Sequence, residues 1–209
     1  MLDGIVEKDG ILYYYETGKP KQAGLIEIDG GYYFANGTNG ELTVNENRYV
    51  WKTNGLMNAS EYEFGPDGKM YDGIIKKDGV LYYYEKGKPK MAGLIKIGDD
   101  YYFAGGSNGE LSVNKTQYVW QSNGLLPEKN YDFDENGKMY NGFFERNGTK
   151  YYYVNGRPAP VGLNYVDGYY YFVKYDGSLI VNQSYYAWET NGLSVEMTYT
   201  FNENGQIVG

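Results

Sequence analysis

An internal repeat constrains the fold of this chain more than any other feature of its sequence. The segment DGIVEKDGILYYYETGKPKQAGL (3–25) returns as DGIIKKDGVLYYYEKGKPKMAGL (72–94) and then as NGFFERNGTKYYYVNGRPAPVGL (141–163). The offset is 69 residues both times. Repeats of this kind pack against their neighbours in sequence, so we expect a single repeat domain. Its expected bounds are 1–209, with internal units 3–71, 72–140 and 141–209.

The tryptophans follow the same period and locate a deletion. Trp51, Trp120 and Trp188 are separated by 69 and 68 residues. The missing residue lies where AGGSNGEL (104–111) becomes the shorter VKYDGSL (173–179). Changes of length are tolerated best in exposed loops, so the sequence predicts a surface turn at this point.

A shorter pattern of strand, tight turn and strand runs through each repeat. In GIVEK-DG-ILYYYE and GLIEI-DG-GYYFAN, an Asp-Gly pair separates two runs rich in β-branched and aromatic residues, which is typical of a β-hairpin. A third, looser hairpin is expected to pair Tyr49–Trp51 with Tyr62–Phe64. No window shows apolar residues at helical spacing. The sequence therefore predicts an all-β fold, an elongated solenoid of stacked β-hairpins with nine hairpins in all.

Tyrosine supplies 27 of the 209 residues, and the predicted hairpins account for this abundance. An isolated hairpin is at best marginally stable in water, so each must bury an aromatic face against its neighbours. In the runs Tyr13–Tyr15, Tyr82–Tyr84 and Tyr151–Tyr153, successive side chains point to opposite faces of a strand. One face is therefore core. The sequence leaves open which face this is and whether the other is exposed.

The composition excludes several classes of function. The 19 Lys and Arg residues against 27 Asp and Glu give a net charge of −8, so nucleic acid is not an expected partner. The chain contains neither histidine nor cysteine, which removes the usual general base near neutral pH and any thiolate metal site. A three-fold repeat offers no unique cleft for a pair of catalytic carboxylates, so we expect no enzymatic activity and no cofactor.

Metal binding and membrane insertion are also not expected. The segment DFDENGKMY (132–140) places Asp132, Asp134 and Asn136 as in a calcium loop, but the twelfth position is Phe143 where a glutamate is needed. Turn chemistry is the better explanation. No apolar run approaches the roughly 20 residues that span a bilayer. No charged and then apolar leader follows Met1, so an exported form would be a fragment or a processed product.

The repeat resembles a known family. The segments GLIEIDGGYYFANGTNGEL, GLIKIGDDYYFAGGSNGEL and YDFDENGKMYNG are similar to the cell-wall-binding or choline-binding repeats of Gram-positive surface proteins. They are also similar to the related repeats of glucan-binding glucosyltransferases and to the repetitive C-terminal regions of large clostridial toxins. The resemblance implies ligand binding in aromatic grooves between adjacent hairpins. It also implies a location outside the cell or at its surface, within a longer surface protein, and a cell-wall polymer or other polysaccharide as partner.

The chain departs from this family at the positions that would hold choline. Choline-binding repeats carry Gly-Trp at the start of the first strand and Trp-Tyr-Tyr on the second. Here the first position holds Ile5, Leu25, Ile74, Leu94, Phe143 or Leu163. The second holds Leu12, Tyr32, Leu81, Tyr101, Lys150 or Tyr170. A cation cage needs several rings around one charge, so a carbohydrate or another wall polymer fits better than choline.

The tryptophans are the leading candidates for ligand contact. Each ring either is buried and closes the third hairpin, or is an exposed platform for the C–H face of a sugar. Tyrosines of the preceding hairpin are the nearest candidates to complete a groove beside each platform. The predicted ligand-binding residues are Trp51, Trp120, Trp188, Tyr32, Tyr33, Tyr101, Tyr102, Tyr170 and Tyr171.

Basic residues recur in one loop of each repeat, at Lys19, Lys21, Lys88, Lys90 and Arg157. They either contact an anionic polymer such as a teichoic acid or are simply solvated. Two functions remain open at this stage. The first is a noncatalytic module that attaches to cell-wall or extracellular glycan through repeated aromatic grooves. The second is a structural spacer or protein-interaction stalk without glycan specificity.

Overall fold

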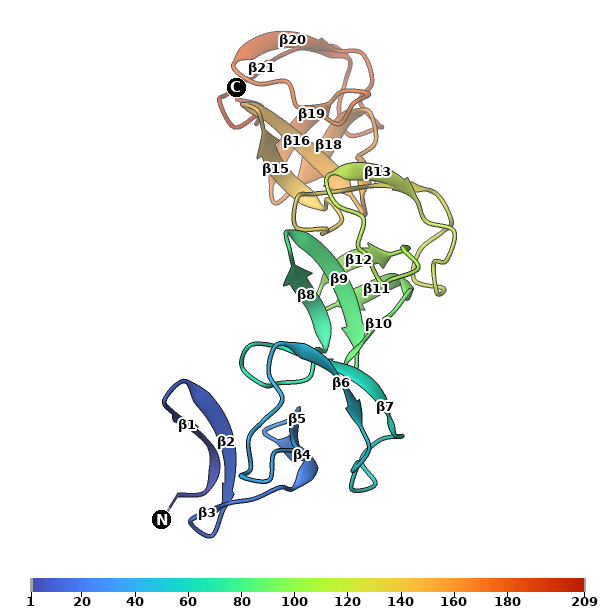
Figure 1. Cartoon of the computed structure of the whole chain (residues 1–209). Helices are drawn as coiled ribbons and strands as arrows, with labels where there is room; N and C mark the ends of the chain where they lie inside the picture. The colour runs from blue at the N-terminus through green and yellow to red at the C-terminus, as the bar shows by residue number, and fades with distance from the viewer. Residues whose placement is uncertain (1, 209) are drawn as a thin grey trace. The chain divides into compact units, whose positions relative to one another are not determined.

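A computed structural model describes residues 2–208, and all regular secondary structure within them is β (Figure 1). The strands form nine small antiparallel sheets, each built on one hairpin. The prediction of an all-β chain of nine hairpins is confirmed. Across residues 2–208, the model contains no helix that is long and apolar enough to cross a membrane.

Each repeat contributes seven strands in the same order. The first contains β1 (Gly4–Lys8), β2 (Ile11–Glu16), β3 (Lys19–Pro20), β4 (Gly24–Ile28), β5 (Gly31–Ala35), β6 (Glu46–Val50) and β7 (Ser60–Phe64). The second contains β8 (Gly73–Lys77), β9 (Val80–Glu85), β10 (Lys88–Pro89), β11 (Gly93–Ile97), β12 (Asp100–Ala104), β13 (Lys115–Tyr118) and β14 (Asn130–Phe133). The third contains β15 (Gly142–Arg146), β16 (Thr149–Val154), β17 (Arg157–Pro158), β18 (Gly162–Val166), β19 (Tyr169–Val173), β20 (Gln183–Ala187) and β21 (Met197–Phe201).

The tight turns have the backbone geometry that their sequence predicts. In the Asp9-Gly10 turn both residues have positive φ, 53° and 76°, as a type I′ turn requires. Glycine adopts this conformation without steric cost, and aspartate tolerates it because its short side chain can bond locally. At Gly98-Asp99 the positive φ falls on the glycine alone, which is the type II′ pattern. These turns fix the register of the hairpins, as in the pairing of Lys8 with Ile11.

The third hairpin differs from the predicted pairing. The β6–β7 ladder ends where Val50 pairs with Ser60, and Tyr49 faces Glu61 rather than Tyr62–Phe64. Trp51 therefore lies just beyond the ladder. The chain leaves the ladder at this point because the next carbonyl, that of Lys52, accepts a 2.8 Å hydrogen bond from the amide of Leu25 in the second hairpin.

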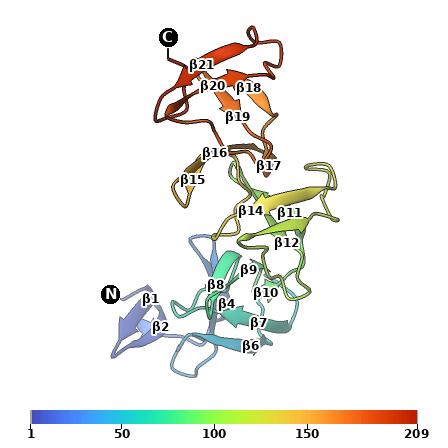
Figure 2. The same ribbon diagram turned by 90° about the horizontal axis from the view of Figure 1, so that it is seen from above.

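The chain divides into two compact units. The first contains the residues up to Ala92 together with Ala104–Leu111, and the second contains Gly93–Phe103 together with the residues from Ser112 onward. Several small cores join adjacent hairpins within each unit. In the second unit, for example, Leu163 and Phe172 pack with Phe201 and hold β18–β19 beside β20–β21, an arrangement visible in Figures 1 and 2.

Phenylalanine fills the centre of these small cores. Six phenylalanines are at most 1% exposed, and each contributes about 1.5–3 kcal/mol through burial. The second hairpins carry Phe34, Phe103 and Phe172, and the third hairpins carry Phe64, Phe133 and Phe201. Phe34 and Phe64 stack with ring centroids 6.5 Å apart, which shows how one hairpin locks onto the next.

The tyrosine runs of the first hairpins use both faces of the strand. Tyr15, Tyr84 and Tyr153 are buried. The middle residue, Tyr14, lies on the opposite face and packs against the cluster formed by Ala23, Ala35 and Leu42. Both faces of β2 therefore take part in packing. The predicted surface turn is confirmed at residues 174–176, which are exposed.

Candidate functional site

The three tryptophans occupy equivalent and exposed positions. Trp51 follows β6 directly, Trp188 follows β20 directly, and Trp120 comes two residues after the end of β13. The exposed fraction of the side chain is 57% for Trp51, 46% for Trp120 and 40% for Trp188. The interpretation of a buried ring that closes the third hairpin is therefore wrong. The sequence predicted the position of these rings but not which of the two environments they occupy.

Each tryptophan ring rests on a buried phenylalanine of the second hairpin. The centroids of Trp51 and Phe34 are 6.4 Å apart at an angle of 84°, and those of Trp120 and Phe103 are 6.1 Å apart at 89°. Trp188 meets Phe172 at 6.0 Å and 66°. These steep contacts orient each indole on the core and leave much of its surface in solvent.

The backbone after each tryptophan is fixed by a side-chain amide. The Nδ2 of Asn54 donates to the carbonyls of Ala23 and Leu25 at 2.8 and 2.7 Å. Asn191 makes the same pair of bonds to Val161 and Leu163 at 3.0 and 2.8 Å. The backbone that carries the exposed rings is therefore rigid, so less conformational entropy is lost when a ligand binds to them.

An exposed tyrosine precedes each tryptophan by two residues. We call Tyr49 with Trp51, Tyr118 with Trp120, and Tyr186 with Trp188 the Tyr-x-Trp pairs. All six side chains are exposed, while the residue between the two aromatics is fully buried in every pair. The two aromatic residues thus flank a residue that packs inward, and much of each ring stays in solvent. We did not predict these tyrosines, although the alternation around an apolar Val50, Val119 or Ala187 was a signal for them.

The predicted tyrosines of the second hairpin do not form a single face with the tryptophans. Tyr32 packs against the core that contains Phe34, whereas Tyr33 lies on the other face of β5 and packs against the cluster of Ala23, Ala35 and Leu42. In the other repeats, Tyr101 packs like Tyr32, Tyr102 is partly buried, Tyr170 contacts Tyr165, and Tyr171 is buried. A role for these tyrosines in ligand binding stays a prediction.

Burial also affects the ionisation of these tyrosines. Desolvation is the main cause that raises the pKa of Tyr33, and the charges of Asp67 and Asp29 raise it further. The pKa of Tyr102 is raised in the same way, first by burial and then by Asp100. Both hydroxyls are therefore neutral at physiological pH and can donate hydrogen bonds.

The third repeat has the richest aromatic surface. The ring of Tyr175, which is 79% exposed, stacks on Trp188 with centroids 6.0 Å apart and an angle of 26°. The indole Nε1 of Trp188 donates to the hydroxyl of Tyr185 at 3.2 Å. Tyr175 belongs to the shortened turn, so the one-residue deletion coincides with an additional aromatic side chain beside the tryptophan.

Three of the recurring basic residues, Lys21, Lys88 and Lys90, have local partners. Lys21 forms an ion pair with Glu16 and Lys90 with Glu85, and these hydrogen bonds raise the pKa of both lysines. The ammonium of Lys88 donates to Ser60 at 2.6 Å. The glutamates offset the positive charge that an anionic polymer would need.

The calcium-like segment behaves as a turn. The carboxylate Oδ1 of Asp134 accepts hydrogen bonds from the amides of Asn136 and Lys138, both at 2.8 Å. Such bonds from an Asp side chain to nearby backbone amides stabilise turns. Within residues 2–208 there is no group of three or more acidic side chains arranged to hold a metal ion.

The solved structures to which this chain is similar include choline-binding proteins of pneumococcus. No family model matches the chain, and no curated protein matches its sequence. Among solved structures, choline binding protein F from Streptococcus pneumoniae is 24% identical over 95% of this chain and 61% of that protein, with a TM-score of 0.44. CbpJ from Streptococcus pneumoniae TIGR4 is 16% identical over 98% of this chain and 93% of its own, with a TM-score of 0.43.

A third structure is the choline-binding domain of CbpL from Streptococcus pneumoniae, which is 20% identical over 100% of this chain and 98% of its own, with a TM-score of 0.39. The chain thus spans less than two thirds of choline binding protein F. All three TM-scores are below 0.5, so we base the function on the residues of the chain itself.

Proposed function

We propose that the chain is a noncatalytic attachment module that binds a cell-wall polymer or another extracellular polysaccharide through its Tyr-x-Trp pairs. The observation that supports this proposal is the recurrence of two exposed aromatic rings at the same place in every repeat. Single exposed apolar residues are common on protein surfaces. Three copies of one exposed pair call for a partner that itself repeats, and a polysaccharide is such a partner.

The chemistry of the pairs suits a sugar ring. An indole face covers the C–H face of a pyranose, while the tyrosine hydroxyl and the indole N–H can bond the hydroxyl groups at its edge. The first two pairs would bind a quaternary ammonium less tightly than a sugar. The rings in contact with Trp51 and Trp120 are Phe34 and Phe103, which are buried and have no face to turn toward a cation.

Several weak sites on one chain are enough for attachment. Once one pair holds a polymer, the next pair meets it at a high effective concentration, and the avidity exceeds the affinity of either site alone. The absence of histidine and cysteine fits a binding module better than an enzyme. Such a module would work outside the cell or at its surface, as part of a longer surface protein. Of the rival functions without glycan specificity, a structural spacer needs no exposed aromatic pairs, whereas a protein-interaction stalk would use them to contact a protein.

The proposal can be tested by removing the tryptophans. Because these rings are exposed, Trp→Ala changes at positions 51, 120 and 188 should leave the fold intact, as circular dichroism and the melting temperature will check. We expect a single variant to bind wall polymer modestly less well and the triple variant to lose about 100-fold or more in apparent affinity. The measurement is a pull-down on purified peptidoglycan, teichoic acid, dextran and starch.

A matched control uses other exposed apolar side chains. Ile11 and Ile97 are 39% and 43% exposed and lie on β2 and β11, outside the Tyr-x-Trp pairs. The double Ile→Ala variant should bind polymer as the parent does. A folded triple tryptophan variant that still binds like the parent would refute the proposal and favour the spacer.

A further inference from the structure

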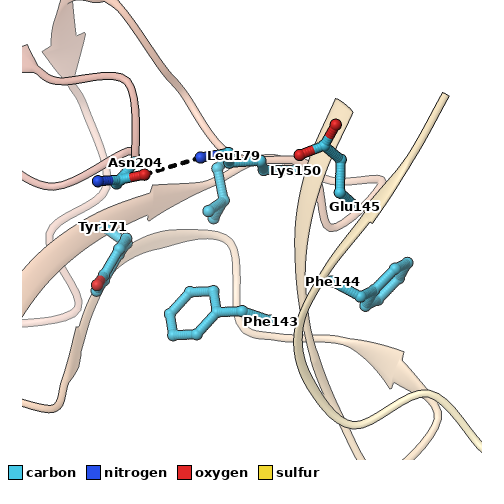
Figure 3. A pocket seen from close by; sticks show the side chains of 7 residues that line it. All are labelled: Phe143, Phe144, Glu145, Lys150, Tyr171, Leu179 and Asn204. Atoms are coloured by element: carbon cyan, nitrogen blue, oxygen red, sulfur yellow. Dashed lines mark hydrogen bonds between the residues drawn. The ribbon is translucent and has the colours of Figure 1, made fainter. Parts of the chain in front are cut away.

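The second unit contains a pocket between the first and second hairpins of the third repeat. Figure 3 shows the seven lining side chains, with the ring of Phe144 turned away from that of Phe143. Its volume is about 290 Å³. The lining includes Phe143 and Glu145 of β15, Lys150 of β16, Tyr171 of β19, and Leu179 and Asn204. The pocket shares no residue with the Tyr-x-Trp pairs.

A leucine stands at the position of Lys150 in the first two repeats. Leu12 of the first repeat packs against the cluster of Ala23, Ala35 and Leu42. The backbone around this position is the same in the third repeat. The amide of Leu42 donates to the carbonyl of Leu12 at 2.8 Å, and the amide of the equivalent Leu179 donates to the carbonyl of Lys150 at 2.9 Å. The difference therefore lies in the side chain.

Lys150 extends its charged end to the edge of the pocket. Its ammonium donates to the Oδ1 of Asn204 at 2.9 Å, as drawn in Figure 3. A leucine at this position would place branched methyl groups against the neighbouring apolar side chains. The lysine instead leaves space above its flexible stem and carries a hydrogen-bond donor to the rim.

The pocket joins an aromatic floor to a polar rim. Phe143 is 43% exposed, and its ring contacts Tyr152 at 4.5 Å and Tyr171 at 4.7 Å between centroids. Glu145 lies directly across the strand pair from Lys150. The rim thus offers an ammonium donor, a carboxylate acceptor and, on Asn204, an amide that does both.

The charges and the size of the pocket limit its ligand. The positive charge of Lys150 and the negative charge of Glu145 offset each other, so neither an anion nor a cation gains a net attraction. A volume of about 290 Å³ lies at the lower end of the range for small-molecule sites, which suits one sugar ring.

We propose that this pocket binds a single pyranose unit of a neutral saccharide. The ring of Phe143 covers the C–H face of the sugar, and Lys150, Glu145 and Asn204 bond its hydroxyl groups. The inference deepens the proposed polysaccharide function by adding a second kind of site. Because the two sites have no residue in common, either can fail without the other.

The test introduces residues that the other repeats already carry. Lys150→Leu restores the residue of Leu12 and Leu81, and Phe143→Ile restores that of Ile5 and Ile74, so both variants should fold. Binding of glucose, N-acetylglucosamine, glucuronate and glucosamine is followed by NMR titration of the full chain. We expect the two neutral sugars to shift signals of pocket residues, and Lys150→Leu to weaken that binding about tenfold or more. Phe143→Ile should weaken it as well.

A matched control tests whether the effect belongs to the pocket. Lys129→Leu replaces an exposed lysine outside the pocket and should leave binding unchanged. The proposal is overturned if neutral sugars shift no pocket signal, if both pocket variants bind like the parent, or if glucuronate or glucosamine binds more tightly than glucose. A negative result here together with an intact polymer pull-down would leave the attachment function standing.

Discussion

A single buried hydroxyl distinguishes the first repeat from the third. The side chain of Thr43 is 3% exposed, and its Oγ1 has no hydrogen-bond partner within residues 2–208. An unpaired buried hydroxyl costs about 1–3 kcal/mol. The amide of Thr43 donates to the carbonyl of Phe34, and in the third repeat the amide of Ile180 donates to the carbonyl of Phe172. An apolar side chain therefore fits the same backbone position.

Thr43→Val should stabilise the protein. Valine keeps the shape of threonine and removes the unpaired hydroxyl, so we expect the free energy of unfolding to rise by about 1 kcal/mol. Thermal unfolding followed by circular dichroism measures the effect. Thr38→Val, at an exposed site, provides the control and should change little. A lower melting temperature for Thr43→Val would show that the hydroxyl has a partner in solution.

At the scale of the hairpin, the glycines that start the first and the second hairpins have the same backbone conformation but differ in how closely other atoms approach them. Gly4 starts a first hairpin with φ of 80°, and Gly24 starts a second hairpin with φ of 82°. A Cβ added at Gly24 would lie 2.6 Å from the carbonyl oxygen of Lys52, whereas nothing lies within 4 Å of a Cβ added at Gly4. Gly24 is thus needed for the close approach of two hairpins as well as for its φ.

Alanine at these two glycines should separate the two effects. Gly4→Ala introduces only the left-handed backbone, which costs about 1–2 kcal/mol. Gly24→Ala adds a clash with backbone, and we expect a further loss of about 1–3 kcal/mol. Chemical denaturation of both variants measures the difference. Equal losses would mean that the close approach relaxes freely and that the contact does not hold the hairpins together.

The hairpins could be predicted from sequence because their signals are local. An Asp-Gly or Asn-Gly pair dictates its own backbone conformation, and the alternating aromatic residues beside it define the strands. The environment of Trp51 could not be predicted in this way. Its exposure depends on where the chain leaves the β6–β7 ladder, and that point is set by the bond between Lys52 and Leu25, two residues far apart in sequence.

The candidate site could be predicted only in part, because part of it depends on contacts between residues far apart in sequence. Sequence period alone identified the tryptophans. Alternation along the strand predicts that Tyr32 and Tyr33 face opposite ways. The sequence did not show that both faces are packed against cores, because this depends on the neighbouring hairpins. The pocket at Lys150 was not predicted either, since it depends on how one substituted side chain lies among residues from four separate segments.

At the scale of the whole chain, the first hairpin of each repeat is completed by residues that come later. Isolated bridges join Tyr13 to Glu41, Tyr82 to Glu110, and Tyr151 to Ser178. The first compact unit accordingly includes Ala104–Leu111 although Gly93–Phe103 belongs to the second. A fragment that ends soon after a first hairpin therefore loses this pairing, although the partner residue belongs to the same repeat.

Two fragments should reveal this dependence. In a fragment of residues 1–92, the amide of Tyr83 loses its acceptor, the carbonyl of Gly109, whereas a fragment of residues 1–111 retains it. We expect the Tyr83 amide to exchange with solvent about tenfold or more faster in the shorter fragment, because its local opening costs less. The Leu25 amide, bonded to Lys52 in both fragments, is the internal reference. Equal exchange at Tyr83 would show that the hairpin is stable alone.

Because the same backbone arrangement occurs three times, side chains can change in one repeat while the other two keep the original ones. The hydrogen bond from the second hairpin to the residue after the tryptophan recurs at Leu25, Leu94 and Leu163, so each copy holds its own second and third hairpins together. Two copies can then serve the proposed attachment while the third carries changes such as Lys150 and Tyr175. Duplication within one chain thus leaves one copy free to change its side chains while the other two keep the arrangement that all three share.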